Sequence, residues 1–383
     1  MAQRKLGIIM HGITGRMGLN QHLARSICAI RDAGGVELSN GDRIMPDPIL
    51  VGRNVEKVQA IADRFGIARV APDVETALAN PDDTVFFDAG STQMRVELLR
   101  RAMAAGKHVY SEKPVAETVD EALDLARRAK ANGLKNGAVQ DKLYLPGLCK
   151  MRMLKDAGFF GRILSVRVEF GYWVFEGDLQ PAQRPSWNYR KADGGGVILD
   201  MLPHWRYVVD NLFGEIQAIS CVGRVHVPRR WDERGQAYDA DAEDAAYVTL
   251  ELEDGAIAQI NSSWTTRVKR DDLVTFHVDG DLGSAVAGLT RCHTQHRVNT
   301  PRPIWNPDQP QAMTFADQWE EVPETVSYEN GFRAQWEDFL RHVVDDTPWK
   351  YDLLESAKGV QLAELGYRSW EERRVLDVPA LAL

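Results

Sequence analysis

Three glycines spaced three residues apart near the N-terminus constrain the fold more than any other feature of this sequence. An unbroken apolar run at residues 6–10 leads into Gly12, Gly15 and Gly18, and a segment with helical periodicity follows. Glycines in a turn between a buried strand and a helix let a pyrophosphate approach the main-chain N–H groups at the positive end of the helix. The same pattern would also suit a tight turn without a ligand, and its spacing departs from GxGxxG. The strand–turn–helix context favours a dinucleotide, with contacts from Gly12, Ile13, Thr14, Gly15, Arg16 and Met17.

The first third of the chain alternates short apolar runs with amphipathic segments. Runs without polar alternation that are separated by helices are typical of βαβ units, in which helices cover both faces of a parallel sheet. We therefore predict a doubly wound Rossmann domain at residues 1–135. The expected strands lie at residues 6–10, 48–52, 84–90 and 107–112, and the expected helices at 18–30, 54–66, 93–106 and 118–133.

The remainder of the chain has a different pattern. After a helix at residues 147–156, long stretches alternate apolar and polar residues, which is typical of an antiparallel sheet with one exposed face. We predict a second α/β domain with a large, mostly antiparallel sheet at residues 136–383, whose C-terminal helices are available to pack back on the first domain. The expected strands lie within 163–175, 244–264 and 272–280, the helices at 331–344 and 353–370, and a long loop at 291–311.

Composition narrows the class of protein. The 383 residues carry a formal net charge of −9, which disfavours binding to nucleic acid or an acidic membrane surface. The four cysteines are scattered without CxxC spacing, and no segment is long and apolar enough for a membrane span, so we expect a soluble, cytoplasmic protein with reduced thiols. Cys292, His293 and His296 lack a second ligand pair at zinc spacing, and we expect no metal site.

The type of dinucleotide depends on the residues after the second expected strand. An acidic side chain there would bond the ribose 2′-hydroxyl of NAD, whereas this chain has Gly52, Arg53 and Asn54. A guanidinium can pair with the 2′-phosphate of NADP, which favours NADP over NAD as the cofactor. The alternative is an arginine that only faces solvent. We include Arg53 and Asn54 among the expected cofactor contacts.

Two further stretches carry a family resemblance. Residues 104–122, AAGKHVYSEKPVAETVDEA, resemble the AGKHVxxEKPxA signature of the Gfo/Idh/MocA oxidoreductases, and residues 187–205, WNYRKADGGGVILDMLPHW, resemble the GGGxLxDxGxH element of that family. The resemblance covers nearly the whole chain. It implies an NAD(P)-dependent enzyme that acts on CH–OH groups of sugars or cyclic polyols, and a homodimer or homotetramer formed through the C-terminal sheet. It places Glu112 and Lys113 in the EKP motif, and Asp200 and His204 in the second block. It also implies that Lys113 contacts the cofactor and that Glu112 either contacts the cofactor or positions Lys113.

The chain departs from the family pattern at two places. Residues 90–95, GSTQMR, stand where a TPNxxH-like stretch is common, so that Arg95 replaces the histidine. Ser91 and Thr92 remain expected cofactor contacts there, on the nicotinamide side. Leu202 and Pro203 replace the glycine that usually precedes the histidine of the second block.

The chemistry of these side chains suits alcohol oxidation. Asp200 and His204 are four apart in a helical pattern, so they share one helix face, where the carboxylate can fix the imidazole tautomer and the other ring nitrogen can take a hydroxyl proton. Lys113 follows a strand end, where an ammonium can stabilise a developing alkoxide. An ordinary helix pair and a surface lysine are the alternatives that the residues alone leave open.

Aromatic and basic residues suggest where a polyhydroxylated substrate binds. Flat rings stack on the C–H faces of sugars, and cationic side chains donate to hydroxyl oxygens, although aromatic residues are also common in cores and interfaces. The expected substrate contacts are Lys113, Lys142, Trp173, Trp187, Arg190, Asp200 and His204, with Lys142 on the strand after the EKP helix.

Three functions remain open on the sequence. The first is a sugar or polyol dehydrogenase. The second is a glycoside hydrolase that oxidises the ring transiently, eliminates the aglycone and reduces the ring back with a recycled NAD. The third is a dinucleotide-binding sensor without catalysis, against which the intact Lys113, Asp200 and His204 argue.

Overall fold

The computed structural model describes residues 2–324, 327 and 329–383. The chain divides into two compact units. Unit 1 comprises Met1–Tyr144, Glu329–Gln361 and Ala380–Leu383, and unit 2 comprises Leu145–Tyr328 and Leu362–Pro379. The sequence-based bounds at residues 135 and 136 stay a prediction.

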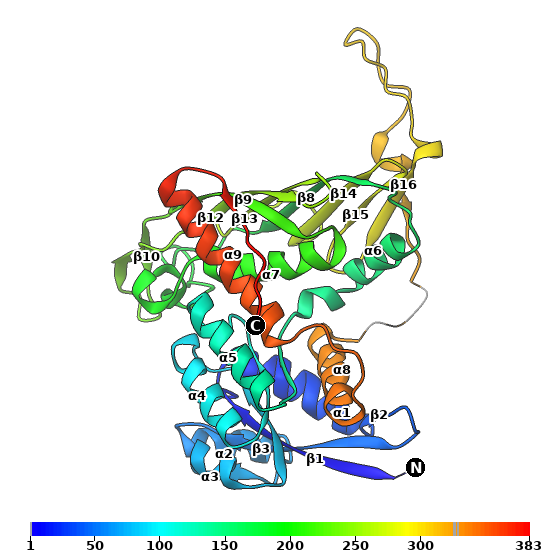
Figure 1. The fold of residues 1–383 in the computed structure, drawn as a ribbon. Coiled ribbons are helices and arrows are strands. Elements are labelled where there is room, and N and C mark those ends of the chain that lie inside the picture. Colours follow the sequence, from blue (N-terminus) through cyan, green and yellow to red (C-terminus); the bar gives the residue numbers. More distant parts are fainter. Residues whose placement is uncertain (1, 325–326, 328) are drawn as a thin grey trace. The chain divides into compact units, whose positions relative to one another are not determined.

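Unit 1 is built on a largely parallel sheet, of which Figure 1 labels β1, β2 and β3. The strand order is β2-β3-β1-β5-β6-β7, and β4 also pairs with β3. The chain runs from β1 to β3 on one side of β1 and then returns to β5 on its other side. The strand order therefore reverses between β1 and β5, and ligands of such sheets bind at the carboxyl ends of the strands at this point. The strands are β1 (Gln3–His11), β2 (Val36–Glu37), β3 (Arg43–Val51), β4 (Val70–Ala71), β5 (Asp83–Asp88), β6 (His108–Ser111) and β7 (Asn136–Ala138).

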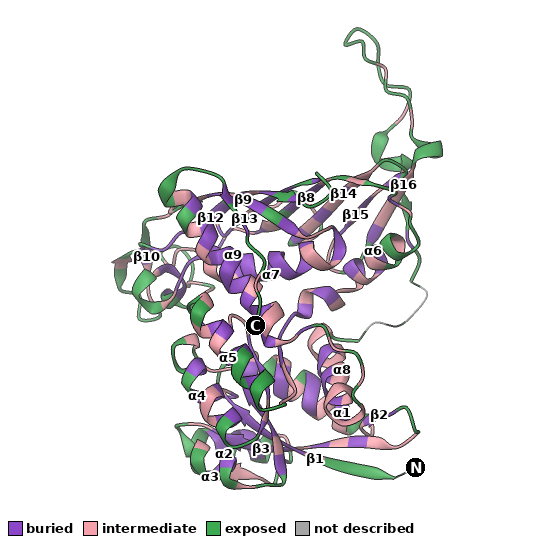
Figure 2. Cartoon of the chain, viewed as in Figure 1, coloured by how far each residue is buried: buried purple, intermediate pink, exposed green. Residues whose placement is uncertain are grey.

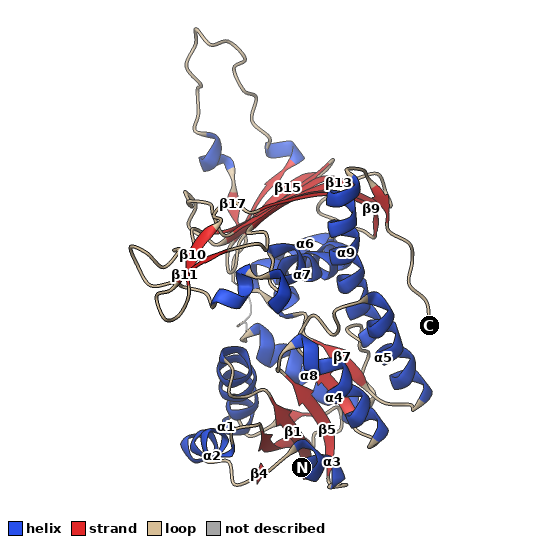
Figure 3. Cartoon of the chain, turned by 90° about the vertical axis from the view of Figure 1, so that its left-hand side faces the viewer, coloured by secondary structure: helices blue, strands red, loops and turns tan. Residues whose placement is uncertain are grey.

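Helices cover both faces of this sheet, as the sequence predicted (Figure 3). Alternate residues of one strand serve the two sides: Ile9 belongs to a core with α3, α4 and α5, and Ile8 to a core with η1, α2 and α8. The expected helix at 18–30 is mostly a π-helix, and α3 was not expected. The elements are η1 (Gly18–Cys28), α1 (Ala29–Asp32), α2 (Val55–Arg64), α3 (Val74–Ala79), α4 (Thr92–Ala104), α5 (Val119–Ala131) and α8 (Gly331–Asp345), together with the 3₁₀ turn η2 (Asp141–Tyr144).

Unit 2 is built on a sheet that, in the described residues, has nine strands in the order β17-β16-β15-β14-β8-β13-β12-β9-β18. Its neighbours pair antiparallel except for β8 and β13, which confirms the mostly antiparallel sheet. The strands are β8 (Ile163–Gly171), β9 (Ile216–Arg224), β12 (Ala245–Leu252), β13 (Ile257–Ser263), β14 (Val274–Gly280), β15 (Gly283–Ala287), β16 (Cys292–His296), β17 (Glu320–Glu321) and β18 (Leu376–Asp377), and a separate hairpin joins β10 (Arg229–Trp231) and β11 (Ala237–Asp239).

Helices α6 (Pro146–Asp156) and α7 (Val197–Leu212) lie along one face of this sheet (Figures 1 and 3). Burial follows that arrangement: Val248 and Leu250 of β12 are buried, whereas Tyr247 on the other face of the same strand is exposed. The last helix, α9 (Leu353–Glu372), begins in unit 1 and ends in unit 2. No helix within the described part of the chain is both long and apolar enough to cross a membrane.

The expected loop at 291–311 is partly wrong, because its first residues pair with β15 as strand β16. This stretch lacks the alternation of apolar and polar residues that identifies a strand. It lies near the edge of the sheet, where polar residues occupy both faces. The chain between β16 and β17 then forms an exposed extension (Figure 2). It holds the 3₁₀ turns η5 (Arg297–Asn299) and η6 (Phe315–Gln318), and two more such turns, η3 (Ser186–Tyr189) and η4 (Lys191–Asp193), precede α7.

The turn after β1 requires glycine for a steric reason. Gly12 has a φ of +77°, and a Cβ built on it would lie 2.3 Å from the main-chain carbon of Ala89, in the turn after β5. The turns that follow the two strands at the reversal point are thus in direct main-chain contact. This approach leaves no room for a side chain at residue 12.

We predict that Gly12→Ala lowers the free energy of unfolding by about 3 kcal/mol or more, because it combines a left-handed conformation with a main-chain clash. Gly66→Ala is the matched control: Gly66 has a φ of +63° but no atom within 4 Å of a built Cβ, so about 1–2 kcal/mol is expected. Urea unfolding followed by tryptophan fluorescence measures both. Equal losses in the two variants would contradict the steric argument.

Candidate functional site

The glycine-rich turn of unit 1 has the form of a phosphate cradle. Residues 12–17 lead from β1 into η1, whose N-terminal cap residue Met17 makes no side-chain capping hydrogen bond. The first turn of η1 contains no acidic residue, so no negative charge opposes an anion at the positive helix end. Together with the space that Gly12 leaves free of a Cβ, these features fit a pyrophosphate held by main-chain N–H groups. The cofactor contacts predicted here stay predictions.

A buried ionic network fixes the strand ends beside this turn. The carboxylate of Asp88, at the end of β5, lies 2.7 Å from Nδ1 of His11 and accepts a 2.8 Å hydrogen bond from Nε of Arg95. Burial by itself raises the pKa of Asp88, but the hydrogen bond from His11 and the charge of Arg95 outweigh it and lower that pKa. The strand ends are therefore joined by an ionised carboxylate.

Arg95 is also the residue that replaces the histidine expected at this position. It is 2% exposed, and its two terminal nitrogens donate to the carbonyl oxygens of Gly90, at 2.7 Å, and of Pro114. Arg95 thus links the turn after β5 to the segment that follows Lys113. This role could not be predicted from the sequence, because Asp88 and Pro114 share no local motif with Arg95.

Lys113 follows β6 and is half-buried. Its main-chain N–H donates to Oε2 of Glu112 at 3.1 Å, and Oε1 of Glu112 lies 2.8 Å from Nε2 of the buried His22. Burial favours a raised pKa for Glu112, whereas the hydrogen bond from His22 and the charges of Lys113 and Arg95 lower it overall. Glu112 is thus a carboxylate that holds the main chain of Lys113.

The other cofactor contacts predicted in unit 1 lie on loops and helix starts. Arg53 is exposed just after β3. The side chain of Asn54 caps α2 by accepting from the N–H of Lys57 at 2.9 Å, a structural role that the sequence analysis missed. Ser91 is the N-terminal cap residue of α4, and the hydroxyl of Thr92 accepts a 3.3 Å hydrogen bond from Arg95.

In unit 2, Asp200 and His204 both lie on α7, where the spacing of four places them on one helix face. Oδ2 of Asp200 accepts a 3.0 Å hydrogen bond from Arg184. Nδ1 of His204 lies 2.6 Å from the hydroxyl of Tyr207, one turn further along the helix. His204 is only 6% exposed, so the ring orientation is fixed by packing as well as by this bond. Tyr207 was not singled out in the sequence, although its spacing of three from His204 on a helix could have indicated the contact.

The remaining predicted substrate contacts have distinct surroundings. Lys142 lies in the 3₁₀ turn η2 and donates to Asp141 at 2.6 Å; its expected strand position is wrong, because β7 ends at Ala138. Trp187, in η3, is 50% exposed, and the guanidinium of Arg190 lies 4.4 Å from the ring centre of Tyr238. No described group of three His, Cys, Asp or Glu side chains could hold a metal ion.

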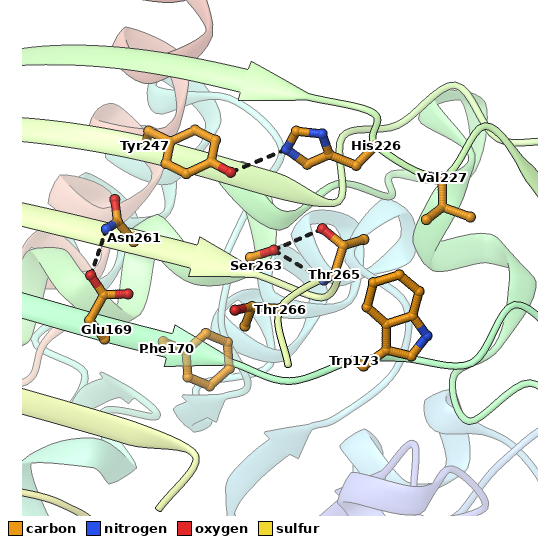
Figure 4. Close-up of a pocket in the computed structure, with 10 residues that line it drawn as sticks. All are labelled: Glu169, Phe170, Trp173, His226, Val227, Tyr247, Asn261, Ser263, Thr265 and Thr266. Atoms are coloured by element: carbon orange, nitrogen blue, oxygen red, sulfur yellow. Dashed lines mark hydrogen bonds between the residues drawn. The ribbon is translucent and has the colours of Figure 1, made fainter. Parts of the chain in front are cut away.

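Trp173 lines a different feature, a pocket of about 330 Å³ at the ends of β8 and β13 (Figure 4). Glu169, Tyr247 and Asn261 contribute to it from positions that pair across three neighbouring strands. Their side chains point away from the core that α7 covers, because their strand neighbours Val168, Ala246, Val248, Ile260 and Ser262 are buried. Trp173 therefore shares this pocket with residues of the uncovered sheet face, and the subunit interface expected there stays a prediction.

Comparison with known proteins agrees with this architecture. Residues 48–138 match the model of the oxidoreductase family with an NAD-binding Rossmann fold, and residues 149–286 match the model of the GFO/IDH/MocA C-terminal domain. A D-xylose dehydrogenase of Paenarthrobacter nicotinovorans is 53% identical over 380 residues, which cover 98% of each chain. A levoglucosan dehydrogenase of Pseudarthrobacter phenanthrenivorans is 25% identical over 63% of this chain and 65% of its own.

Among solved structures, a levoglucosan dehydrogenase in complex with NADH superimposes with a TM-score of 0.81 at 20% identity, covering 99% of this chain and 100% of the other. This likeness concerns the fold. The identity of more than half over almost the full length, together with the two matching models, decides the family: the chain belongs to the Gfo/Idh/MocA oxidoreductases, with an NAD-binding Rossmann fold in its N-terminal part.

Proposed function

We propose that this oxidoreductase is a sugar dehydrogenase that oxidises a ring CH–OH group of D-xylose or a closely similar pyranose. The observation that carries this proposal is the 53% identity, over 98% of both chains, to a protein named for D-xylose dehydrogenation. The intact Lys113, Asp200 and His204 support it, since a protein that only binds the dinucleotide would have no need of them.

Each of these residues has a chemical role in the proposal. A bound nicotinamide dinucleotide supplies the hydride acceptor. Lys113 donates a hydrogen bond to the reacting oxygen and stabilises the negative charge that develops on it. When the proton of the neutral His204 ring is on Nδ1, it is donated to the Tyr207 oxygen, and the lone pair of Nε2 can accept the substrate hydroxyl proton.

Asp200 acts through charge in this proposal. Its carboxylate is paired with Arg184, whose guanidinium lies 3.9 Å from the ring centre of Trp264. Asp200 lies on the same helix face as His204. A carboxylate there stabilises the imidazolium that forms when His204 takes the proton.

We expect D-xylose with NAD or NADP to give an absorbance increase at 340 nm, with a kcat/KM at least about tenfold above that for myo-inositol or levoglucosan, because a pocket that pairs its polar groups with one sugar leaves them unpaired with another. Product analysis as lactone or ketone identifies the oxidised carbon. Release of nitrophenol from a nitrophenyl xyloside without accumulation of reduced cofactor would instead establish the glycoside hydrolase function. Absence of any turnover with all these sugars would contradict both.

We expect Lys113→Met and His204→Asn each to lower kcat for D-xylose by about 100-fold or more, since electrostatic stabilisation and general-base catalysis each contribute on that scale. Lys130→Met, on the exposed last turn of α5, is the control and should leave kcat unchanged. Steady-state kinetics with saturating cofactor measures all three. Wild-type turnover in Lys113→Met would exclude the role given to this ammonium.

We also propose that Arg53 recognises a 2′-phosphate, so that NADP is bound at least as tightly as NAD. Its support is the exposed guanidinium directly after β3, next to Gly52 and Asn54 rather than to an acidic residue. Arg53→Ala is expected to raise the Kd for NADP about tenfold, which corresponds to about 1.4 kcal/mol, and to leave the Kd for NAD within about twofold. Titration calorimetry measures both. A wild-type Kd for NAD below that for NADP would contradict this assignment.

A further inference from the structure

A chain of three buried side chains in unit 1 leads from α8 to the main chain of Lys113. His22, on η1, is fully buried, and each of its ring nitrogens has a partner. Nε1 of Trp336 donates to Nδ1 of His22 at 3.0 Å, and Nε2 of His22 lies 2.8 Å from Oε1 of Glu112. Oε2 of Glu112 then accepts the N–H of Lys113 at 3.1 Å.

The donor of this chain determines the tautomer of His22. An indole nitrogen can only donate, so Nδ1 of His22 has to accept and bears no proton. The proton of the neutral ring is therefore on Nε2, where it is donated to the carboxylate of Glu112. The opposite tautomer would place an indole N–H against an imidazole N–H, and a lone pair against a carboxylate.

This arrangement fixes Lys113 from one side, and a second contact fixes it from the other. Glu112, the residue before Lys113, is hydrogen-bonded to His22. Pro114, the residue after Lys113, accepts a hydrogen bond from Arg95 at its carbonyl oxygen. The main chain at Lys113 is thus held at both flanking residues. The side chain of Lys113 is directed by a peptide segment that has little freedom to rotate.

We propose that His22 and Trp336 are positioning residues for Lys113. Trp336 selects the His22 tautomer, His22 orients the Glu112 carboxylate, and Glu112 sets the main-chain direction from which the lysine side chain projects. The inference rests on the proposed function, because it assigns these residues to a lysine that acts on the reacting oxygen. It extends that function to two residues that lie outside both motifs of the family, one of which contacts Glu112 of the EKP motif.

Packing alone does not account for the pair. The ring centre of His22 lies 4.4 Å from that of Phe87 and 5.2 Å from that of Phe332, so an apolar side chain could fill this space. Both ring nitrogens of His22 are hydrogen-bonded, so this side chain connects Trp336 to Glu112 in addition to filling space. The proposal therefore distinguishes variants by hydrogen-bonding capacity rather than by size.

The test compares three variants of the full chain with Lys113→Met as reference. Trp336→Phe keeps an aromatic ring and removes the indole donor. His22→Leu removes both nitrogens, whereas His22→Gln keeps an N–H that can donate to Glu112. We expect kcat for D-xylose to fall about tenfold in Trp336→Phe and His22→Leu and to stay within about threefold in His22→Gln, with the Kd for the dinucleotide within twofold throughout.

A second measurement does not depend on turnover. In ¹⁵N-histidine-labelled protein, with the His22 signals assigned from His22→Gln, Nδ1 of His22 should resonate as an unprotonated nitrogen and Nε2 as a protonated one. Trp336→Phe should move the Nδ1 signal away from its wild-type position, because this nitrogen loses its hydrogen-bond donor.

The outcomes separate this inference from the proposed function. If the wild-type protein turns over none of the sugars, the proposed function fails, and if Lys113→Met keeps wild-type turnover, the role of Lys113 in that function fails. The positioning role is overturned by a different result. In that case Lys113→Met is inactive, but Trp336→Phe, His22→Leu and His22→Gln all have the kcat of the wild type. A protonated Nδ1 in the wild type overturns it as well. Should His22→Leu fail to fold, Trp336→Phe and the nitrogen shifts still decide.

Discussion

The arrangement of unit 1 depends on the hydrogen bonds that the carboxylate of Asp88 makes with His11 and Arg95. Asp88 stands at the end of β5, where the strand order reverses, and it is bonded to His11 at the end of β1 and to Arg95 on α4. A buried carboxylate without partners is strongly unfavourable, so these positions are restricted far more tightly than apolar contacts would restrict them. Arg95 carries the restriction on to the turn at Gly90 and to Pro114, next to Lys113.

The glycines of the first turn follow from this closeness. Because the ends of β1 and β5 are drawn together, the turns after them meet main chain against main chain, and Gly12 has no space for a Cβ. The turn was open to two readings in the sequence, a phosphate cradle or a tight turn. The two are not exclusive, since the same absence of side chains that permits the close approach leaves N–H groups accessible to an anion.

The features that could be predicted from the sequence have local signals. The strands and helices of the Rossmann domain could be predicted because apolar runs and amphipathic segments alternate at short range. Lys113, Asp200 and His204 could be identified because each stands in a short motif. His22 and Trp336 gave no such signal: they are 314 positions apart, and a histidine in a helical pattern or a tryptophan in an amphipathic helix is read as core. Strand β16 was missed for a related reason, since partly exposed edge residues hide the alternation that identifies a strand.

In unit 2, as in unit 1, a buried acidic side chain holds separate segments of the chain together. Glu243, just before β12, accepts the N–H of Ile198 at 2.9 Å and the hydroxyl of Tyr367 at 2.9 Å. Glu243 is fully buried, and this burial raises its pKa despite the two hydrogen bonds.

The contact of Glu243 with Ile198 fixes where α7 starts, and a Cβ on Gly196 would lie 2.5 Å from Oε1 of Glu243, so the chain can enter the helix along only one path. The positions of Asp200 and His204 follow from that starting point, because helix geometry then sets every later residue. In each unit the residues named in the family motifs are thus placed by a buried acid that lies outside them. Substitution of such an acid would displace the motif residues without touching them.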